Sequence, residues 1–491
     1  MNILKRPMFF AAIACCTISA GSLFSKPLTY FLIIVALLTL LIVTFKKQYK
    51  YLTVFVFISL FICSLFLEFA KIELINDLDG DYIKGEFVVV EDLTAYDDYN
   101  NVVIKEKNCD SIPNGTKIFL FDYKKTKLKY GDVIDVTLRL NSIKENNKYR
   151  ISNFSEGIYA TANTKTIVKL NKKDVFYKSL GDVRQYVKKN ISARFSGDKA
   201  GLLLAITTGD KCLLSEDFSH NIKTTGISHV IVVSGMHLSI IMAAIFLFID
   251  KIFYNKYVRC ILSIFVVFII YSVCGFTASI TRAGAMFVVA GIAPIFNRDN
   301  DSLSSLLTAI TIIIITAPFI VFNVSFLLSV VSTLAIIWIV PFYLNILNSR
   351  FNIKSLFLKA IIGSVLCSFI AVIFTLPIII KVFGYVSIVG PITNLIINIP
   401  ITIALISNII AVLVNAIPII HHISFLMFQL AGLCSQFCEY IVNQIAKLPV
   451  TVAVLPKSAF WWSIFFIALI IGYMYYYEYK KKRSDFNANS I

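Results

Sequence analysis

The sequence predicts a polytopic α-helical membrane protein of about twelve transmembrane helices, some of them discontinuous, with a small β-barrel domain inserted outside the membrane. Three observations predict it. Apolar residues make up 57% of the chain and charged residues 15%, whereas soluble proteins have an apolar content of about 45–50%. Apolar runs of about 20 residues recur at both ends. Between them, residues 71–175 alternate apolar and charged side chains.

The amino-terminal region, residues 1–70, holds three apolar runs that are each long enough to cross a bilayer. The second and third runs are separated by lysines, and basic loops tend to stay inside the cell. We therefore expect a cytoplasmic amino terminus, a first run retained as an anchor, and a chain that emerges outside after the third run. The runs lie near residues 7–24, 27–45 and 51–67.

The β-rich region, residues 71–175, contains short alternating runs separated by turn-prone segments such as "DDYNN" and "PNGT". Five or six strands of this length predict an extracytoplasmic barrel, and an OB-like barrel fits the size. Its one cysteine, Cys109, excludes an internal disulfide. A lysine cluster is either a solvated hairpin tip or a DNA-contacting basic patch. The cluster comprises Lys124, Lys125, Lys127 and Lys129.

An amphipathic helix is predicted next, within residues 176–198. Apolar residues recur there at helical spacing, from Phe176 to Phe195, and basic residues occupy other faces. The pattern fits an interfacial helix on the membrane surface, and equally a helix packed on the barrel.

Residues 199–480 are almost continuously apolar and predict about nine further crossings. An odd number of crossings returns the chain to the cytoplasm, where the basic tail 481–491 is expected. The weakest of the nine, 424–446, could instead be a surface or re-entrant helix. The nine lie near 228–247, 258–276, 280–296, 303–322, 324–346, 356–380, 394–414, 424–446 and 459–477.

Residues that start or end helices occur in the first part of this region and predict two short helices there. One short apolar helix is predicted to stop at Gly209-Asp210, and a second to run from Ser215 to Gly226. Interrupted backbone at membrane depth is tolerated only where protein or a water-filled cavity surrounds it. The apolar segment that follows carries polar side chains, which we therefore expect to line a cavity; the alternative is that they hydrogen-bond neighbouring helices. They are His229, Ser234 and His237, with Gly235 as a further break.

Other polar residues lie inside the predicted crossings. Arg282 cannot shed its proton, which favours cavity or phosphate contact over a structural ion pair. Pro391 and Pro400 predict breaks in a discontinuous helix that also carries Asn394. Asp299 and Asp301, beside Arg298, are expected to cap the helix that starts at Ser302.

Together these motifs resemble the signature of the ComEC-type competence family, membrane channels for DNA uptake. The resemblance rests on Gly209-Asp210, Gly226, His229 and Ser234-Gly235-x-His237, and on "ASITRAGAM", "NRDNDSLSSLL", "VFNVSFLLSV" and "FGYVSIVGPITNLIINIP". "KYGDVIDVTLRL" and "NFSEGIYATANT" resemble the family's OB-like domain, so the resemblance covers essentially residues 1–480. It implies a channel that passes single-stranded DNA into the cytoplasm through a wet path. The expected path or cavity residues are Asp210, His229, Ser234, His237, Arg282 and Asn394.

One departure concerns partners. Many family members carry a further metallo-β-lactamase-like domain, whereas this sequence ends at Ile491 and lacks a His-x-His-x-Asp-His ligand set. We therefore expect no metal and no cofactor, and a separate nuclease. No Gly-x-x-x-x-Gly-Lys-Ser/Thr loop is present, so a cytoplasmic ATPase is expected as another partner, besides a DNA receptor and the lipid bilayer.

Two other functions stay open on the sequence. Asp210, His229 and Ser234 supply the residue types of a hydrolase triad, so a membrane-embedded hydrolase or an enzyme for a lipid-linked substrate is the alternative. No nucleophile elbow accompanies them, and we expect no enzymatic activity. The hypothesis of a small-anion transporter has the least support, because it does not explain the extracytoplasmic barrel.

Overall fold

The computed structural model describes most of the chain in two compact units. The C-terminal unit comprises Asn190–Ala244 and Leu327–Ile491, and the barrel unit comprises Asn2–Lys189 and Ile245–Phe326. The described residues are 7–22, 52–91, 94–95, 99–126, 128–144, 149–228, 241–242, 245, 249, 251–274, 278–296, 301–351, 354–416, 421–449, 451–456 and 458–488.

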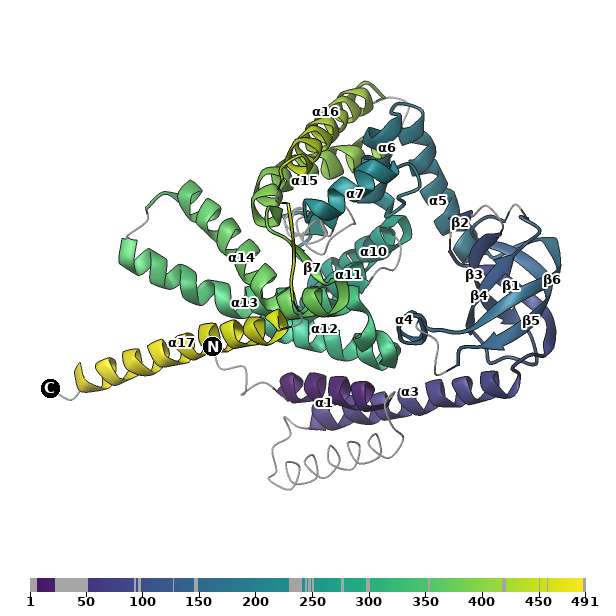
Figure 1. Cartoon of the computed structure of the whole chain (residues 1–491), viewed down its shortest axis with the longest axis horizontal. Helices are drawn as coiled ribbons and strands as arrows, with labels where there is room; N and C mark the ends of the chain where they lie inside the picture. The colour runs from purple at the N-terminus through teal and green to yellow at the C-terminus, as the bar shows by residue number, and fades with distance from the viewer. Residues whose placement is uncertain are drawn as a thin grey trace. The chain divides into compact units, whose positions relative to one another are not determined.

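A closed β-barrel occupies the barrel unit (Figure 1). Among the described residues, five strands close the ring in the order β1-β5-β6-β4-β3-β1, and the two-residue strand β2 pairs with β3. Neighbouring strands are antiparallel except β4 and β6, which are parallel. The predicted small barrel is thus confirmed. The strands are β1 (Tyr82–Val89), β2 (Thr94–Ala95), β3 (Asn100–Asn108), β4 (Lys117–Asp122), β5 (Asp132–Ser142) and β6 (Ile158–Lys173).

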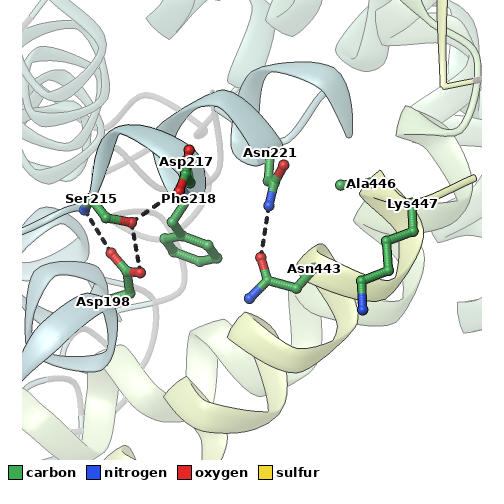
Figure 2. Close-up of a pocket in the computed structure, with 8 residues that line it drawn as sticks. All are labelled: Asp198, Ser215, Asp217, Phe218, Asn221, Asn443, Ala446 and Lys447. Atoms are coloured by element: carbon green, nitrogen blue, oxygen red, sulfur yellow. Dashed lines mark hydrogen bonds between the residues drawn. The ribbon is translucent and has the colours of Figure 1, made fainter.

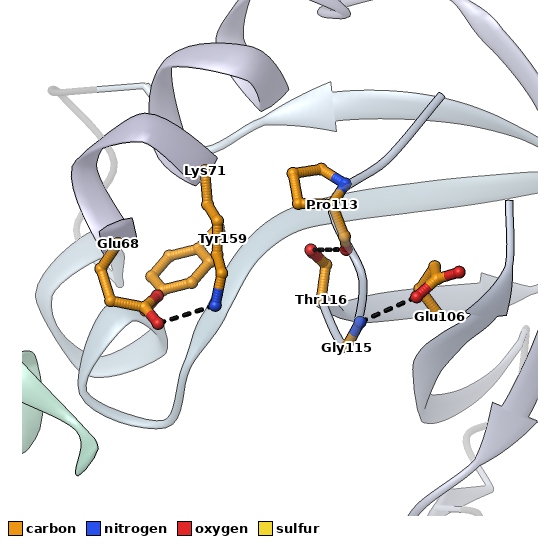
Figure 3. A network of polar contacts seen from close by, with 7 residues as sticks. All are labelled: Glu68, Lys71, Glu106, Pro113, Gly115, Thr116 and Tyr159. Atoms are coloured by element: carbon orange, nitrogen blue, oxygen red, sulfur yellow. Dashed lines mark hydrogen bonds and ion pairs between the residues drawn. The ribbon is translucent and has the colours of Figure 1, made fainter. Parts of the chain in front are cut away.

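Alternating side chains build the barrel core. On β4, Ile118 and Leu120 are fully buried while Phe119 and Phe121 are partly exposed, because successive side chains of a strand face opposite sides. The β3–β4 hairpin is held by the buried Glu106 carboxylate, which accepts the backbone N–H group of Cys109 (3.0 Å). It also accepts the N–H group of Gly115 (2.8 Å), as Figure 3 shows.

Helix α3 (Leu52–Asp77) joins the barrel to the amino-terminal helices. The Glu68 carboxylate accepts the Tyr159 hydroxyl of β6 (2.5 Å) and the Lys71 ammonium (2.8 Å) (Figure 3). Burial, and then the Glu68 charge, raise the pKa of Tyr159, so its hydroxyl stays a donor. The helix runs ten residues past the predicted crossing 51–67, because these contacts support its charged final turns.

An aromatic cluster extends this junction. Phe319, 1% exposed, lies 5.8 Å from the ring of Phe69 in α3, 5.9 Å from Phe154 and 6.3 Å from Tyr159. Phe154 belongs to α4 (Arg150–Ser155), the short helix between β5 and β6. Three regions that are distant in the sequence, namely α3, the α4–β6 stretch and η4, therefore share one ring cluster.

The remaining helices of the barrel unit coincide with predicted crossings, with one correction. The crossing predicted at 303–322 is interrupted: α12 (Ser302–Thr316) ends before a short 3₁₀ helix, η4 (Pro318–Phe322). Proline has no N–H and disfavours helical geometry in the residue before it, here Ala317. As expected, Asp301 caps α12 by accepting the Ser304 N–H (2.9 Å). The others are α1 (Pro7–Ser22), α10 (Lys256–Cys274), α11 (Ala278–Ile292) and η3 (Ala293–Phe296).

The C-terminal unit is helical. Within the described part of the chain, five helices, α13 to α17, are long and apolar enough to cross a membrane by length and composition, and the segment 424–446 belongs to one of them. The count of about twelve crossings stays a prediction. The helices are α6 (Gly197–Thr208), α7 (Glu216–Thr224), α13 (Val324–Phe351), α14 (Leu356–Phe383), α15 (Gly390–Asn415), α16 (His421–Ala446) and α17 (Ala459–Ala488).

Pro400 does not break its helix, contrary to the sequence prediction. Helix α15 continues through it to Asn415, while Pro391 occupies the first turn, where a missing N–H costs nothing. A membrane helix tolerates an internal proline where neighbouring helices and hydroxyl side chains satisfy the freed backbone groups. The interruption lies earlier, between α14 and α15, where the chain forms β7 (Tyr385–Ser387). This strand pairs with β8 (Val452–Val454), which follows α16.

Candidate functional site

The turn between α6 and α7 contains two of the predicted residues. Gly209 ends α6 in the left-handed conformation (φ +78°), and its N–H donates to Ala205 O (3.1 Å). The Asp210 carboxylate accepts the Cys212 N–H (2.9 Å). Asp210 is therefore engaged in the turn itself.

Helix α7 has defined caps at both ends. The Ser215 hydroxyl accepts the Phe218 N–H (3.2 Å) and donates to the Asp198 carboxylate (2.8 Å). At the other end Gly226 is left-handed (φ +75°), and the Ile227 N–H donates to Ile222 O (3.2 Å). These helix ends are where the sequence places them.

Gly226 also marks a close backbone approach. A Cβ atom at this position would lie 2.6 Å from the Ser387 Cβ and 3.1 Å from the Gly390 Cα. Only glycine allows the end of α7 to rest on the turn between β7 and α15. The contact fixes the chain just before the polar segment predicted to line a cavity.

An open pocket of about 410 Å³ lies between α7 and α16 (Figure 2). The Asn221 amide donates across it to the Asn443 amide oxygen (2.9 Å). Two carboxylates and one ammonium give it a mixed charge. It is lined by Asp198, Ser215, Asp217, Phe218, Asn221, Asn443, Ala446 and Lys447.

Helix α15 presents asparagines to several neighbouring helices. The Asn394 amide donates to the Ser368 hydroxyl of α14 (3.2 Å), and the fully buried Asn408 amide donates to the Thr207 hydroxyl of α6 (2.8 Å). The amide oxygens of Asn394 and Asn408 are buried and have no hydrogen-bond partner among the described residues. The sequence identified Asn394 but missed Asn408, although the spacing of 14 residues places both on one helix face.

The last turn of α15 is tied to the end of α5 (Val175–Ser192). The Arg194 guanidinium donates to the amide oxygen of Asn415 (3.0 Å) and to that of Asn190 (3.2 Å), and it stacks over the Phe428 ring of α16 (4.3 Å). The Asn415 amide also donates to Asn190 (2.7 Å). This polar network was not recognised in the sequence, because Asn415 is 221 residues from Arg194 and 225 residues from Asn190.

Arg282 belongs to the barrel unit, where it is nearly buried on α11. Its guanidinium lies 3.8 Å from the sulfur of Met286, one turn further along. Gly284 lets α11 approach α10, because a Cβ there would lie 2.3 Å from the Tyr271 hydroxyl oxygen.

Several predicted residues lie outside the described residues. These are His229, Ser234, Gly235 and His237 of the polar segment and Lys127 of the lysine cluster. Their roles stay predictions. Among the described residues no group of three or more His, Cys, Asp or Glu side chains could hold a metal ion.

The lysine cluster follows β4, and a buried carboxylate holds the base of its loop. Asp122 accepts the N–H groups of Lys124 (3.0 Å) and Thr126 (2.7 Å). The Lys124 ammonium donates to Lys165 O (3.0 Å), and the Lys129 N–H donates to Asp132 (2.8 Å). Lys125 adopts a positive φ of 51°, a turn conformation.

Next to this loop lies an aromatic row that the sequence reasoning missed. The Tyr99 ring lies 5.6 Å from Phe121 and 5.7 Å from Tyr123, and Phe119 lies 5.3 Å from Phe121. The two-residue spacing of "FLFDY" was the available signal, because it places Phe119, Phe121 and Tyr123 on one face of the strand.

Comparison with known proteins adds one finding. A family model described as "Competence protein" matches residues 206–480, which is more than half of the chain. The match begins in α6 and ends in α17. No curated protein and no solved structure matches the chain.

Proposed function

The chain belongs to the competence protein family, and from this premise we propose that it is a membrane channel that passes single-stranded DNA into the cytoplasm during transformation. Membership suggests a role in DNA uptake; the channel and the single-stranded substrate are the proposal. A strand with one charge per nucleotide needs a wet passage whose walls replace bulk water.

The observation that carries the proposal is the polar face of α15. Asn394 and Asn408 each lie in an apolar helix with an amide oxygen that has no partner among the described residues. A buried acceptor without a partner costs about 1–3 kcal/mol. We propose that a route opens beside these buried oxygens, where water or a nucleic-acid strand would supply the missing donors. We propose that Asp210, His229, Ser234 and His237 border this route. Arg282 is proposed to contact a cavity or a phosphate.

The barrel is proposed to receive DNA outside the membrane. Its closed ring of five strands with one parallel pair supports an OB-like fold, in which β3 and β4 would form the binding face. The row of Tyr99, Phe119, Phe121 and Tyr123 offers rings on which bases stack without regard to sequence. The neighbouring lysines Lys124, Lys125, Lys127 and Lys129 would attract the phosphates.

The proposal includes the surroundings of the channel. The protein is a multi-pass protein of the cell membrane with both termini cytoplasmic, consistent with lysines between the second and third apolar runs and in the carboxy-terminal tail. A DNA receptor, a separate nuclease and a cytoplasmic ATPase act with it. The chain itself performs no chemistry.

The test is DNA entry. Deleting the gene should abolish the entry of labelled DNA into a nuclease-protected compartment. Asn394→Leu and Asn408→Leu should each reduce entry, whereas Ile399→Leu, at an exposed position on the same helix, should not. Protein levels in the membrane are measured in parallel by immunoblot. Normal entry after deletion would exclude the channel.

A second comparison separates a channel from an enzyme. Ser234→Ala and His237→Ala should each lower DNA entry only in part if these side chains border a route, because many side chains of the route contact the strand and each contributes a small share. Loss of nearly all activity with either change would favour the membrane-embedded hydrolase instead.

A further inference from the structure

Helix α5 carries two apolar faces, and only one is covered. Leu180, Val187 and Ile191 form a buried face, with at most 4% of each residue exposed. Beside it lies an exposed apolar face of Val175 (80%), Phe176 (44%), Val183 (41%) and Tyr186 (39%). At 100° per residue these four positions span about a quarter of the helix surface, a sector that also holds Ser179, whose hydroxyl donates to Val175 O. We call them the outer face of α5.

The helix is fixed to the barrel along its first turns. The Tyr177 side chain packs against a cluster that includes Val88 and Val103. A Cβ on Gly131 would lie 2.5 Å from the Lys178 nitrogen, so the backbones of the barrel and of α5 are in direct contact. The Lys107–Asp174 ion pair (2.8 Å) anchors the residue before the helix. The outer face is therefore held in a fixed orientation on the barrel.

The outer face continues onto helix α10. The rings of Phe176 and Phe268 lie 6.0 Å apart. Phe268 belongs to an exposed apolar face of α10, a helix that the sequence predicts to cross the bilayer. An exposed apolar face on such a helix contacts lipid. Continuity with it argues that the outer face of α5 meets the same lipid.

Charged residues border the outer face. Lys178 and Lys189 are exposed and lie within about 60° of Val175 around the helix axis, and the exposed Asp182 lies between Lys189 and Val175. A helix in the membrane interface places apolar side chains among the acyl chains and lysines at the phosphates. A protein partner would also cover apolar side chains, but it would not explain the continuity with α10.

We propose that the outer face of α5 lies in the interface of the phospholipid bilayer, with Phe176 and Val183 among the acyl chains and Lys178 and Lys189 at the headgroup phosphates. The helix thereby seats the barrel on the membrane surface. In this proposal each of the two sequence-based interpretations of the helix applies to one of its faces. This inference does not depend on DNA transport.

Photocrosslinking of the full chain in lipid nanodiscs tests it. The crosslinker p-benzoylphenylalanine replaces Val183 on the outer face or, as the matched control, Gln185 on the exposed polar face. The nanodiscs contain phosphatidylethanolamine and phosphatidylglycerol. We expect a lipid adduct at 183, seen by mass spectrometry, with a yield at least ten times that at 185. A protein adduct at 183, or equal lipid yields at both positions, would overturn the proposal.

The headgroup contact has its own measurement. Lys178→Gln and Lys189→Gln should each lower the ratio of phosphatidylglycerol to phosphatidylethanolamine adducts at 183, by up to about fivefold per lysine. Lys165→Gln, on the barrel strand β6, should leave the ratio unchanged. An unchanged ratio in both α5 variants would contradict the proposed contact of Lys178 and Lys189 with the headgroup phosphates. DNA entry is not the readout, so a failure here is distinct from a failure of the channel.

Discussion

At the scale of single residues, buried amides connect helices that are far apart in the sequence. Asn408 and Thr207 are separated by 201 residues, yet their side chains meet at 2.8 Å. In lipid there is little hydrophobic drive between helices, so such hydrogen bonds and close packing hold the helices together. The residue types were visible in the sequence, but the pairing was not, because it depends on how the helices pack.

We predict an energetic coupling between Asn408 and Thr207. Asn408→Ala and Thr207→Val should each lower the free energy of unfolding, and the double variant should lose less than the sum. The coupling should be about 0.5–2 kcal/mol, as for other hydrogen bonds within membranes. Reversible unfolding in detergent measures it. Strict additivity would show that the 2.8 Å contact contributes nothing.

A second residue-scale prediction concerns pH. The hydrogen bond from Lys107 lowers the pKa of Asp174, which also accepts the N–H groups of Phe176 (3.2 Å) and Tyr177 (3.3 Å). A lowered pKa contributes stability above the ordinary value of about 3.9, and this contribution is lost as the pH falls through that value toward the folded-state pKa. Asp174→Asn keeps an acceptor at the start of the helix but loses the ion pair with Lys107, so it should destabilise the protein at pH 7 by up to about 1 kcal/mol, and much less at pH 3.

Thermal unfolding of the two proteins at several pH values measures this difference. Asp182→Asn, in the exposed middle of α5, serves as the control and should have little effect at either pH. A constant difference between Asp174→Asn and the natural chain from pH 7 to pH 3 would contradict the prediction.

At the scale of elements, helix ends were predictable and helix continuity was not. Gly209, Ser215, Gly226 and Asp301 lie at helix ends because their local chemistry caps a helix in any surroundings. Proline depends on its surroundings. Pro318 opens a 3₁₀ turn after α12, whereas α15 runs on through Pro400. The sequence alone does not reveal which neighbours satisfy the freed backbone groups.

Two glycines with the same backbone angle should differ in their tolerance to alanine. Gly226 and Gly384 both have φ +75°, so alanine at either position costs about 1 kcal/mol of strain. At Gly226 the new methyl group also meets the Ser387 Cβ at 2.6 Å, whereas at Gly384 nothing lies within 4 Å. Gly226→Ala should therefore lower the unfolding temperature clearly more than Gly384→Ala. Equal shifts in the unfolding temperature would mean that the turn at Ser387 moves aside at little cost in free energy.

At the scale of the whole molecule, the two compact units are interleaved along the chain. The family segment 206–480 enters the C-terminal unit, contributes α10 to α12 to the barrel unit, and then returns. The closed barrel and most helix positions followed from apolar periodicity. The division into two units could not be predicted from the sequence, because it depends on long-range contacts such as the Phe319 cluster, which joins residues 69 and 319.

Phe319 should control the coupling between barrel and helices. Phe319→Ala removes a buried ring shared by α3, α4 and β6 and should cost about 3–5 kcal/mol. Hydrogen exchange should accelerate in α4 and in the last turns of α3, while β3 and β4 keep their protection. Phe121→Ala, on the partly exposed aromatic row, should change neither. Faster exchange throughout the barrel would show that the cluster supports the whole domain.

The closure of the barrel has a consequence for recognition. In a ring ordered β1-β5-β6-β4-β3-β1, each wall strand already has a partner on both sides. Where the described strands pair on both sides, a visiting chain finds no backbone groups with which to form a further strand. Residues 164–173 of β6 pair with β5 alone and β2 pairs with β3 alone, so strand addition is confined to these edges. Over the rest of the ring, a ligand must be bound through side chains, which suits a polymer of varied bases.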